Sequence, residues 1–267
     1  MSSKSDGSPA CHAFWIGPRL GPIHVACLRS MVAVGHPTFL HVYEEPEDTP
    51  DCVTLVDASN LIPKANIFRH KTGSYAMFSD LFRYAILRAG LGIYVDCDVY
   101  CLRPIEDADY IFAWEDARYI NGAVLKLPAQ SPLLNDLWTA INTAGFIPPW
   151  ERINKRIKWR MKRLVGRYDI TQLPLPNFGP RALTYYARAR RLSHLALPPE
   201  TFYPVHYREV AEALLAPRTP ISAVISPETV AIHLYNKKLP KEQSHIPSDS
   251  ILGQIIQVHM TAERAAV

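Results

Sequence analysis

Two aspartates separated by one residue, Asp96 and Asp98, directly follow the apolar run 93–95, which predicts a short buried strand. In an extended chain, side chains two residues apart point to the same side. Ligands of α/β sheets bind at the carboxyl ends of strands, and two carboxylates there suit Mg²⁺ or Mn²⁺ carrying a diphosphate. The same pattern also occurs in solvated turns, so taken alone it leaves a metal site and an ordinary loop open.

A second charged pair lies just upstream. Asp80 and Arg83 fall within residues 74–89, where the apolar spacing predicts a helix that ends at Gly90. Residues three apart share one face of a helix. The apolar neighbours predict a partly buried helix, in which an unpaired charge is costly. The pair is therefore either an ordinary surface ion pair or part of a binding site.

The elements that would position these residues alternate along the chain, which predicts an α/β fold. We expect one domain, because neither an internal repeat nor a low-complexity linker is present. The expected strands cover 13–16, 38–43, 52–56, 93–95, 110–114, 123–127 and 230–234, and the expected helices cover 22–34, 74–89, 132–144, 181–191 and 248–260.

The residues around both charged pairs resemble a known family. Residues 79–84 and 90–98 are similar to the sugar-binding region with a DxD motif of family 32 glycosyltransferases, although Leu91 separates Gly90 from Gly92. Shorter similarities follow in the family's order at 14–17, 121–123 and 178–180. Residues 231–238 are similar to the C-terminal motif of α1,4-galactosyltransferases, with Tyr235 in place of the usual Trp.

This resemblance implies a GT-A, Rossmann-like nucleotide-sugar-binding fold. We expect it as a single domain over 13–262 with a helical insertion, after an N-terminus at 1–12 whose polar start predicts disorder. It implies a retaining, metal-dependent hexosyltransferase, in which the acceptor hydroxyl attacks the face that the leaving group departs from. The implied cofactor is Mn²⁺ or Mg²⁺ and the donor a UDP-sugar, with UDP-galactose favoured. The implied acceptor is a glycan or glycolipid, as in lipopolysaccharide or polysaccharide biosynthesis.

The resemblance also implies roles for individual residues. The catalytic residues would be Asp80 and Asp98. The metal ligands would be Asp96, Asp98 and His233. The nucleotide sugar would be bound by Trp15, Asp80, Arg83, Tyr94, Asp96, Asn121 and His233.

Composition bounds these expectations. With 267 residues, 48% hydrophobic and 20% charged, the chain can form a substantial core, which excludes global disorder. No apolar run approaches the roughly 20 residues that span a bilayer, and we expect no signal peptide. The five scattered cysteines predict reduced thiols and a cytoplasmic protein.

Basic charge is concentrated in one segment, residues 151–167, which has eight basic residues and one acidic residue. We expect a basic amphipathic helix over 150–167, with Ile153, Ile157, Met161 and Leu164 on one side. Such a helix favours peripheral attachment to an anionic membrane, here the inner face of the plasma membrane. The alternative is a solvated helix that packs on the domain through its apolar stripe. Nucleic-acid binding is disfavoured, because the remainder of the chain is slightly acidic.

Two other functions compete with sugar transfer. A metal-dependent phosphatase of the haloacid dehalogenase type also has Asp-x-Asp after a strand, but it needs Thr or Val where this chain has Tyr100. A binding module that acts through the basic helix alone would leave Asp80, Arg83, Asp96 and Asp98 without a role.

Overall fold

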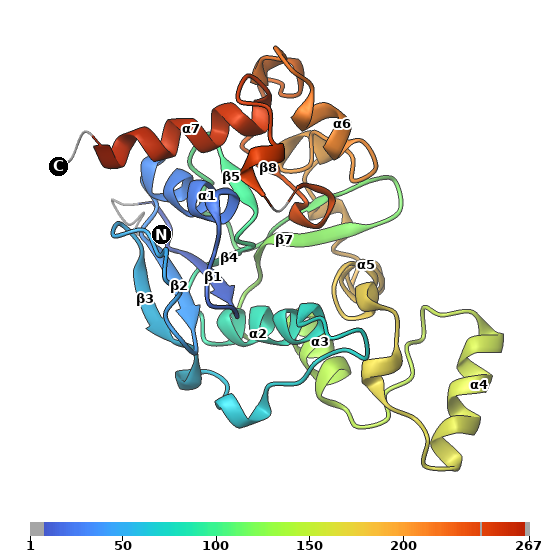
Figure 1. Ribbon diagram of the computed structural model, residues 1–267. Helices are drawn as coiled ribbons and strands as arrows, with labels where there is room; N and C mark the ends of the chain where they lie inside the picture. The colour runs from blue at the N-terminus through green and yellow to red at the C-terminus, as the bar shows by residue number, and fades with distance from the viewer. Residues whose placement is uncertain (1–7, 241, 265–267) are drawn as a thin grey trace, which may run out of the picture.

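A six-stranded, mostly parallel sheet forms the centre of the protein (Figure 1). The computed structural model describes residues 8–240 and 242–264. The strand order is β3-β2-β1-β4-β7-β6, in which β1 to β4 run parallel and β7 runs antiparallel to both of its neighbours. This is the predicted α/β, GT-A-like fold. The strands are β1 (Cys11–Trp15), β2 (Thr38–Val42), β3 (Thr54–Asp57), β4 (Ile93–Val95), β6 (Ile111–Trp114) and β7 (Ile120–Lys126).

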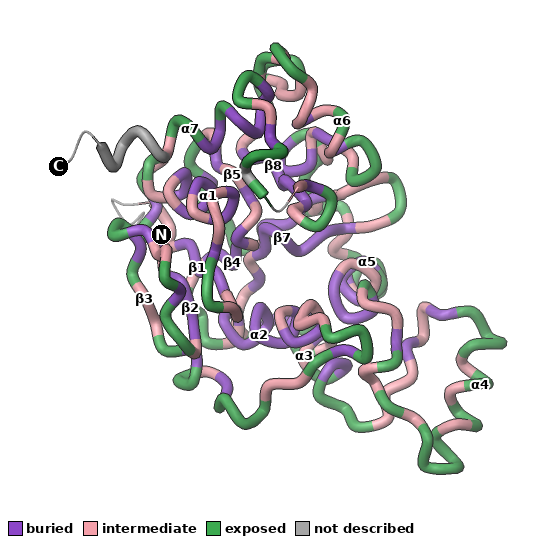
Figure 2. The backbone as a smooth tube through the Cα atoms, in the orientation of Figure 1, coloured by how far each residue is buried: buried purple, intermediate pink, exposed green. Residues whose placement is uncertain are grey.

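Helices cover both faces of this sheet, which explains why its central strands are almost wholly buried (Figure 2). One apolar cluster joins the sheet to α1 (Pro22–Ala33), α6 (Val210–Leu215) and α7 (Ile251–Arg264). A second cluster joins it to α2 (Ala76–Arg88), α3 (Pro132–Asn142) and α5 (Pro180–Ala189). The polar residues at the strand ends are thereby held between two packed layers.

The predicted elements are confirmed to within a few residues at each end. Sequence reasoning missed β5 (Val99–Cys101), which pairs antiparallel with β8 (Ala231–His233), and the short helix α6. The Gly92 position explains the altered glycine pattern. Its φ is +146°, and a Cβ there would lie 2.4 Å from the carbonyl oxygen of Ala10, so only glycine lets β4 begin beside β1.

Two further expectations concern the N-terminus and the cysteines. The expected disorder over 1–12 is wrong at its end, because Cys11 and His12 are buried in β1, where both neighbouring strands pair with them; residues 1–7 lie outside the described residues. All five cysteines are free. Among the described residues, no helix combines the length and apolarity needed to span a bilayer.

The predicted basic helix forms α4 (Ile153–Leu164), shorter than the expected 150–167, and it projects from the body of the protein beyond α5 (Figure 1). The helix does not pack on the domain through its apolar stripe, so the alternative that predicted this packing is wrong. Trp159 faces inward instead and packs against the second apolar cluster. Because Trp159 lies on a different side of the helix from the stripe, the four stripe residues remain exposed.

Candidate active site

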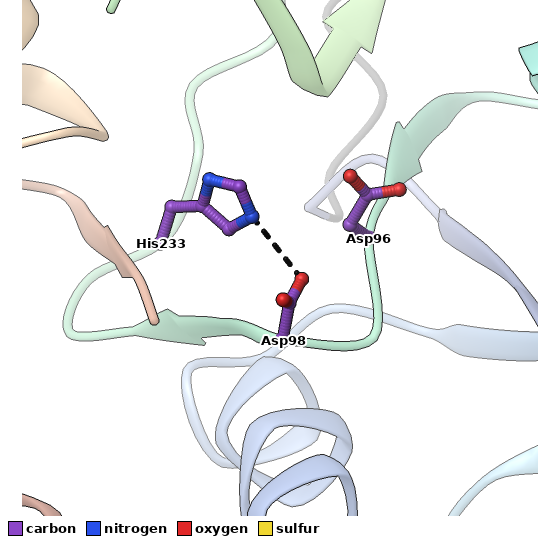
Figure 3. A group of neighbouring side chains, drawn as sticks. All are labelled: Asp96, Asp98 and His233. Carbon is purple, nitrogen blue, oxygen red and sulfur yellow. Dashed lines mark ion pairs between the residues drawn. The ribbon is translucent and has the colours of Figure 1, made fainter. Parts of the chain in front are cut away.

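The Asp-x-Asp motif lies in a tight turn between β4 and β5. The N–H of Val99 donates to the carbonyl oxygen of Asp96 (3.1 Å), so the chain bends here and does not stay extended as the spacing predicted. Both carboxylates still point into the same space (Figure 3). The two side chains are 25% and 19% exposed, which leaves them accessible to a ligand.

His233 joins these aspartates from the far end of the chain. The β5–β8 ladder places Val99 opposite His233, and the N–H of Leu234 donates to the carbonyl oxygen of Asp98 (2.9 Å). The His233 Nε2 consequently lies 3.2 Å from Asp98 Oδ1 (Figure 3). The three predicted metal ligands are therefore neighbours, with one ligand atom of each within 4.8 Å of the others.

The charges of this cluster are mutually stabilised. Burial disfavours the ionised form of Asp98, but the imidazole of His233 and the backbone N–H of Asn236 outweigh burial and hold the pKa of Asp98 well below its usual value. Burial likewise lowers the pKa of His233, and the Asp98 carboxylate outweighs it, so the net pKa is raised. Asp98 is thus held in its ionised form by groups of the protein itself.

The donor set fits a divalent cation. Carboxylate oxygens and an imidazole nitrogen are the ligands that Mn²⁺ and related ions accept. The Nδ1 atom of His233 is buried and has no hydrogen-bond partner among the described residues. Asp96 accepts hydrogen bonds from Arg83 and Tyr94 through Oδ1, which leaves Oδ2, within the part of the chain that the structure describes, for a ligand.

Arg83 connects the two charged pairs that the sequence singled out. Its Nη1 donates to Asp80 Oδ1 (3.0 Å) and its Nη2 donates to Asp96 Oδ1 (2.9 Å). The guanidinium also lies over the ring of Tyr94, 4.6 Å from its centroid, and the Tyr94 hydroxyl donates to the same Asp96 oxygen (2.7 Å). The arginine therefore fixes the orientation of Asp96, a use that suits its planar set of donors.

Asp80 is almost enclosed. Only 9% of its side chain is exposed, and a Cβ on Gly179, at the N-terminus of α5, would lie 2.9 Å from Asp80 Oδ1. The N-terminus of a helix favours negative charge. Burial nevertheless outweighs Arg83 and raises the pKa of Asp80 from 3.8 to about 7.

Asp80→Asn should change how stability depends on pH. The folded protein keeps a proton on Asp80 that the unfolded chain releases above about pH 4, so ionisation of Asp80 lowers the free energy of unfolding as pH rises toward 7. The amide lacks this dependence. Urea unfolding should find the variant about as stable as the wild type at pH 4 and increasingly more stable toward pH 7, by up to about 1.4 kcal/mol per pH unit, with the difference levelling off above pH 7. A difference that stays constant over this range would contradict the assignment.

The other predicted residues lie at the same edge of the sheet but differ in exposure. Trp15, at the end of β1, is half-buried, and its ring lies 4.5 Å from that of His24. Its buried Nε1 has no hydrogen-bond partner among the described residues. Asn121 in β7 accepts from the N–H of Ala123 and donates to Glu115 Oε2 (3.1 Å). The side-chain amide of Asn121 therefore orients the carboxylate of Glu115.

Sequence reasoning missed Glu115, although it named three of the residues around it, Asn121, His233 and Tyr235. Glu115 follows β6 and accepts hydrogen bonds from Asn121 and from the hydroxyl of Tyr235 (3.0 Å). The Tyr235 ring lies 4.0 Å from the His233 ring, so Glu115 belongs to the polar surroundings of the metal ligands. Glu115 directly follows Trp114, the last residue of β6, and this position at the end of a strand could have indicated a site residue.

A mostly parallel α/β sheet with an Asp-x-Asp turn at its carboxyl edge fits the GT-A-like fold of nucleotide-sugar-dependent transferases. Residues 22–116 match the family described as "glycosyltransferase sugar-binding region containing DXD motif", and residues 177–261 match the "alpha 1,4-glycosyltransferase conserved region". Two separate parts of the chain thus match glycosyltransferase families, one that contains the Asp-x-Asp motif and one that contains His233. Comparison with curated proteins finds no match.

Proposed function

We propose that this protein is a retaining hexosyltransferase that uses a UDP-sugar, with galactose as the favoured sugar, and Mn²⁺ or Mg²⁺. The observation that carries the proposal is the convergence of Asp96 and Asp98, from one matched glycosyltransferase region, with His233 from the other. The galactose preference rests on the second match and on residues 231–238. The family itself implies a divalent metal, a nucleotide-sugar donor and a glycan acceptor.

A cation held by Asp96, Asp98 and His233 would neutralise the charge that develops on the diphosphate as the glycosidic bond breaks. Arg83 keeps the Asp96 oxygens oriented for that role. Asp80 would accept hydrogen bonds from hydroxyls of the donor sugar, and the half-buried Trp15 would stack on the base. We assign no protein nucleophile, so the acceptor hydroxyl oxygen would bond to the anomeric carbon on the face from which the diphosphate leaves. The departing phosphate would take the hydroxyl proton.

A cavity of about 790 Å³ supports an acceptor site next to the donor site. The cavity lies between α5 and the segment that leads into α4. The β6–β7 turn borders both this cavity and the candidate active site. In this turn the N–H of Glu115 donates to the carbonyl oxygen of Tyr119 (2.8 Å). Aromatic rings on the cavity wall suit sugar rings, and excess positive charge suits an acceptor that carries phosphate or carboxylate groups. The aromatic residues of the lining are Tyr119, Trp150 and Tyr185. Its basic residues are Arg118, Arg152, Lys155, Arg181 and Arg188, and its acidic residue is Glu151.

Thermal shift with a panel of UDP- and GDP-sugars tests the proposal. With Mn²⁺ or Mg²⁺ present, one donor at about 100 times its dissociation constant should stabilise the protein by about 2.7 kcal/mol, and EDTA should abolish the effect. Transfer to a glycan acceptor, followed by NMR of the product, should then give the same anomeric configuration as in the donor. Absence of any donor response, with phosphate release from simple phosphoesters, would favour the phosphatase alternative.

The membrane-associated cytoplasmic location is a separate part of the proposal. It is supported by the free thiols and by the basic projecting helix α4. The acceptor would then be a glycolipid or a lipid-linked glycan of lipopolysaccharide or polysaccharide biosynthesis.

A further inference from the structure

Helix α4 turns its apolar side to solvent. Ile153, Ile157, Met161 and Leu164 are 61%, 52%, 58% and 80% exposed, and Val165 just beyond the helix is 64% exposed. Their spacing of four, four and three residues forms one continuous stripe. A helix of a globular protein normally buries such a stripe against its core. Here α4 lies in a projecting arm that is coloured mostly as exposed (Figure 2), and the stripe residues are exposed.

The opposite side of α4 is fixed to the protein, so this orientation follows from the packing. Trp159 packs against the apolar cluster that includes α5. Arg163 donates to the carbonyl oxygen of Gly145 (3.2 Å), and Lys162 donates to the side chain of Gln172 (3.2 Å). These contacts hold the stripe outward.

Basic side chains border the stripe. The helix contains six lysines and arginines and no acidic residue. Lys158 and Arg160 are exposed and fall on opposite sides of the stripe at helical spacing. The surface therefore combines an apolar strip with flanking positive charge, which is the arrangement that binds the interface of an anionic bilayer.

We propose that α4 lies flat on an anionic lipid bilayer, with its apolar stripe in the headgroup layer and its cations against lipid phosphates. Charge complementarity selects this occupant. A second copy of the chain would bring two basic helices together, and a nucleic acid would leave the apolar side chains in water. The inference rests on α4 alone and does not require the proposed sugar transfer. If both hold, the bilayer would present a lipid-linked acceptor beside the basic cavity that begins at Trp150.

Vesicle flotation of the full chain tests this surface. Vesicles of phosphatidylcholine with phosphatidylglycerol should carry the protein upward, whereas phosphatidylcholine alone should not. Met161→Asp should lower the partition coefficient at least about tenfold, because one apolar side chain is withdrawn from the interface. Lys158→Gln with Arg160→Gln should lower it about fivefold per removed charge, and added salt should act in the same direction.

Val258→Asp is the matched control. Val258 lies on α7, away from the stripe, and its exposed fraction of 60% is similar to the 58% of Met161. This variant should float like the wild type. Equal binding to both kinds of vesicle, no binding to either, or an unchanged Met161→Asp variant would overturn the inference. A dimer in light scattering that Met161→Asp dissociates would overturn it in favour of a second copy. Donor binding by thermal shift should be the same in all four proteins, so failure of flotation would remove the proposed membrane location but leave the proposed sugar transfer standing.

Discussion

Asp98→Asn should lower kcat/KM for sugar transfer by about 10²–10³-fold, the loss typical when one group that stabilises transition-state charge is removed. The carboxylate is held ionised by His233 and by the N–H of Asn236. Asparagine keeps the size of the side chain and one acceptor oxygen, but it loses the negative charge that a cation requires. We expect the metal concentration for half-maximal activity to rise as well.

The measurement is initial rate against donor concentration at several Mn²⁺ concentrations, together with a thermal melt to show that the variant is folded. Asp109→Asn is a suitable control, because Asp109 is exposed and lies outside the cluster. Its rate should equal that of the wild type. Wild-type activity in the Asp98 variant, with unchanged metal dependence, would remove Asp98 from the site.

Arg83→Met should destabilise the fold by about 3–5 kcal/mol, the usual cost of removing one partner from a buried ion pair. The side chain of Arg83 is only 8% exposed, and it is the hydrogen-bonding partner of both Asp80 and Asp96. Methionine preserves much of the volume, so the loss reports the stranded carboxylates more than a cavity. Activity should fall too, because Asp96 loses its fixed orientation.

Urea unfolding measures the first effect. Arg88→Met is the control on the same helix; Arg88 contacts Asn135 and the ring of Trp138 at the surface, and its loss should cost less than about 1 kcal/mol. Arg83→Lys should recover part of the stability but little of the activity, because one ammonium cannot donate along both directions of the guanidinium. If Asp80→Asn and Arg83→Met have strictly additive effects on stability, their coupling is absent and this account of Arg83 is wrong.

Local patterns were sufficient to predict most elements of this fold. Strand β4 and helix α2 were predictable because an apolar run and a helical repeat each report burial directly. The ion pair of Asp80 and Arg83 was predictable for another local reason, because helix geometry brings side chains three residues apart together. β5 was not predicted, because a three-residue strand after a turn carries too few residues to show a period.

The amino-acid sequence alone was thus enough to predict the α/β alternation, the Asp-x-Asp motif after β4 and the family resemblance that implies its chemistry. The residues that surround this motif could be identified only from the folded structure. The β5–β8 ladder brings His233 to Asp98, and the β6–β7 turn brings Glu115 to Tyr235, because these contacts depend on strand pairing between distant segments. The orientation of α4 likewise depends on tertiary contacts. Its amphipathic pattern shows which side is apolar, but contacts of Trp159 and Arg163 with distant residues determine that this side faces outward.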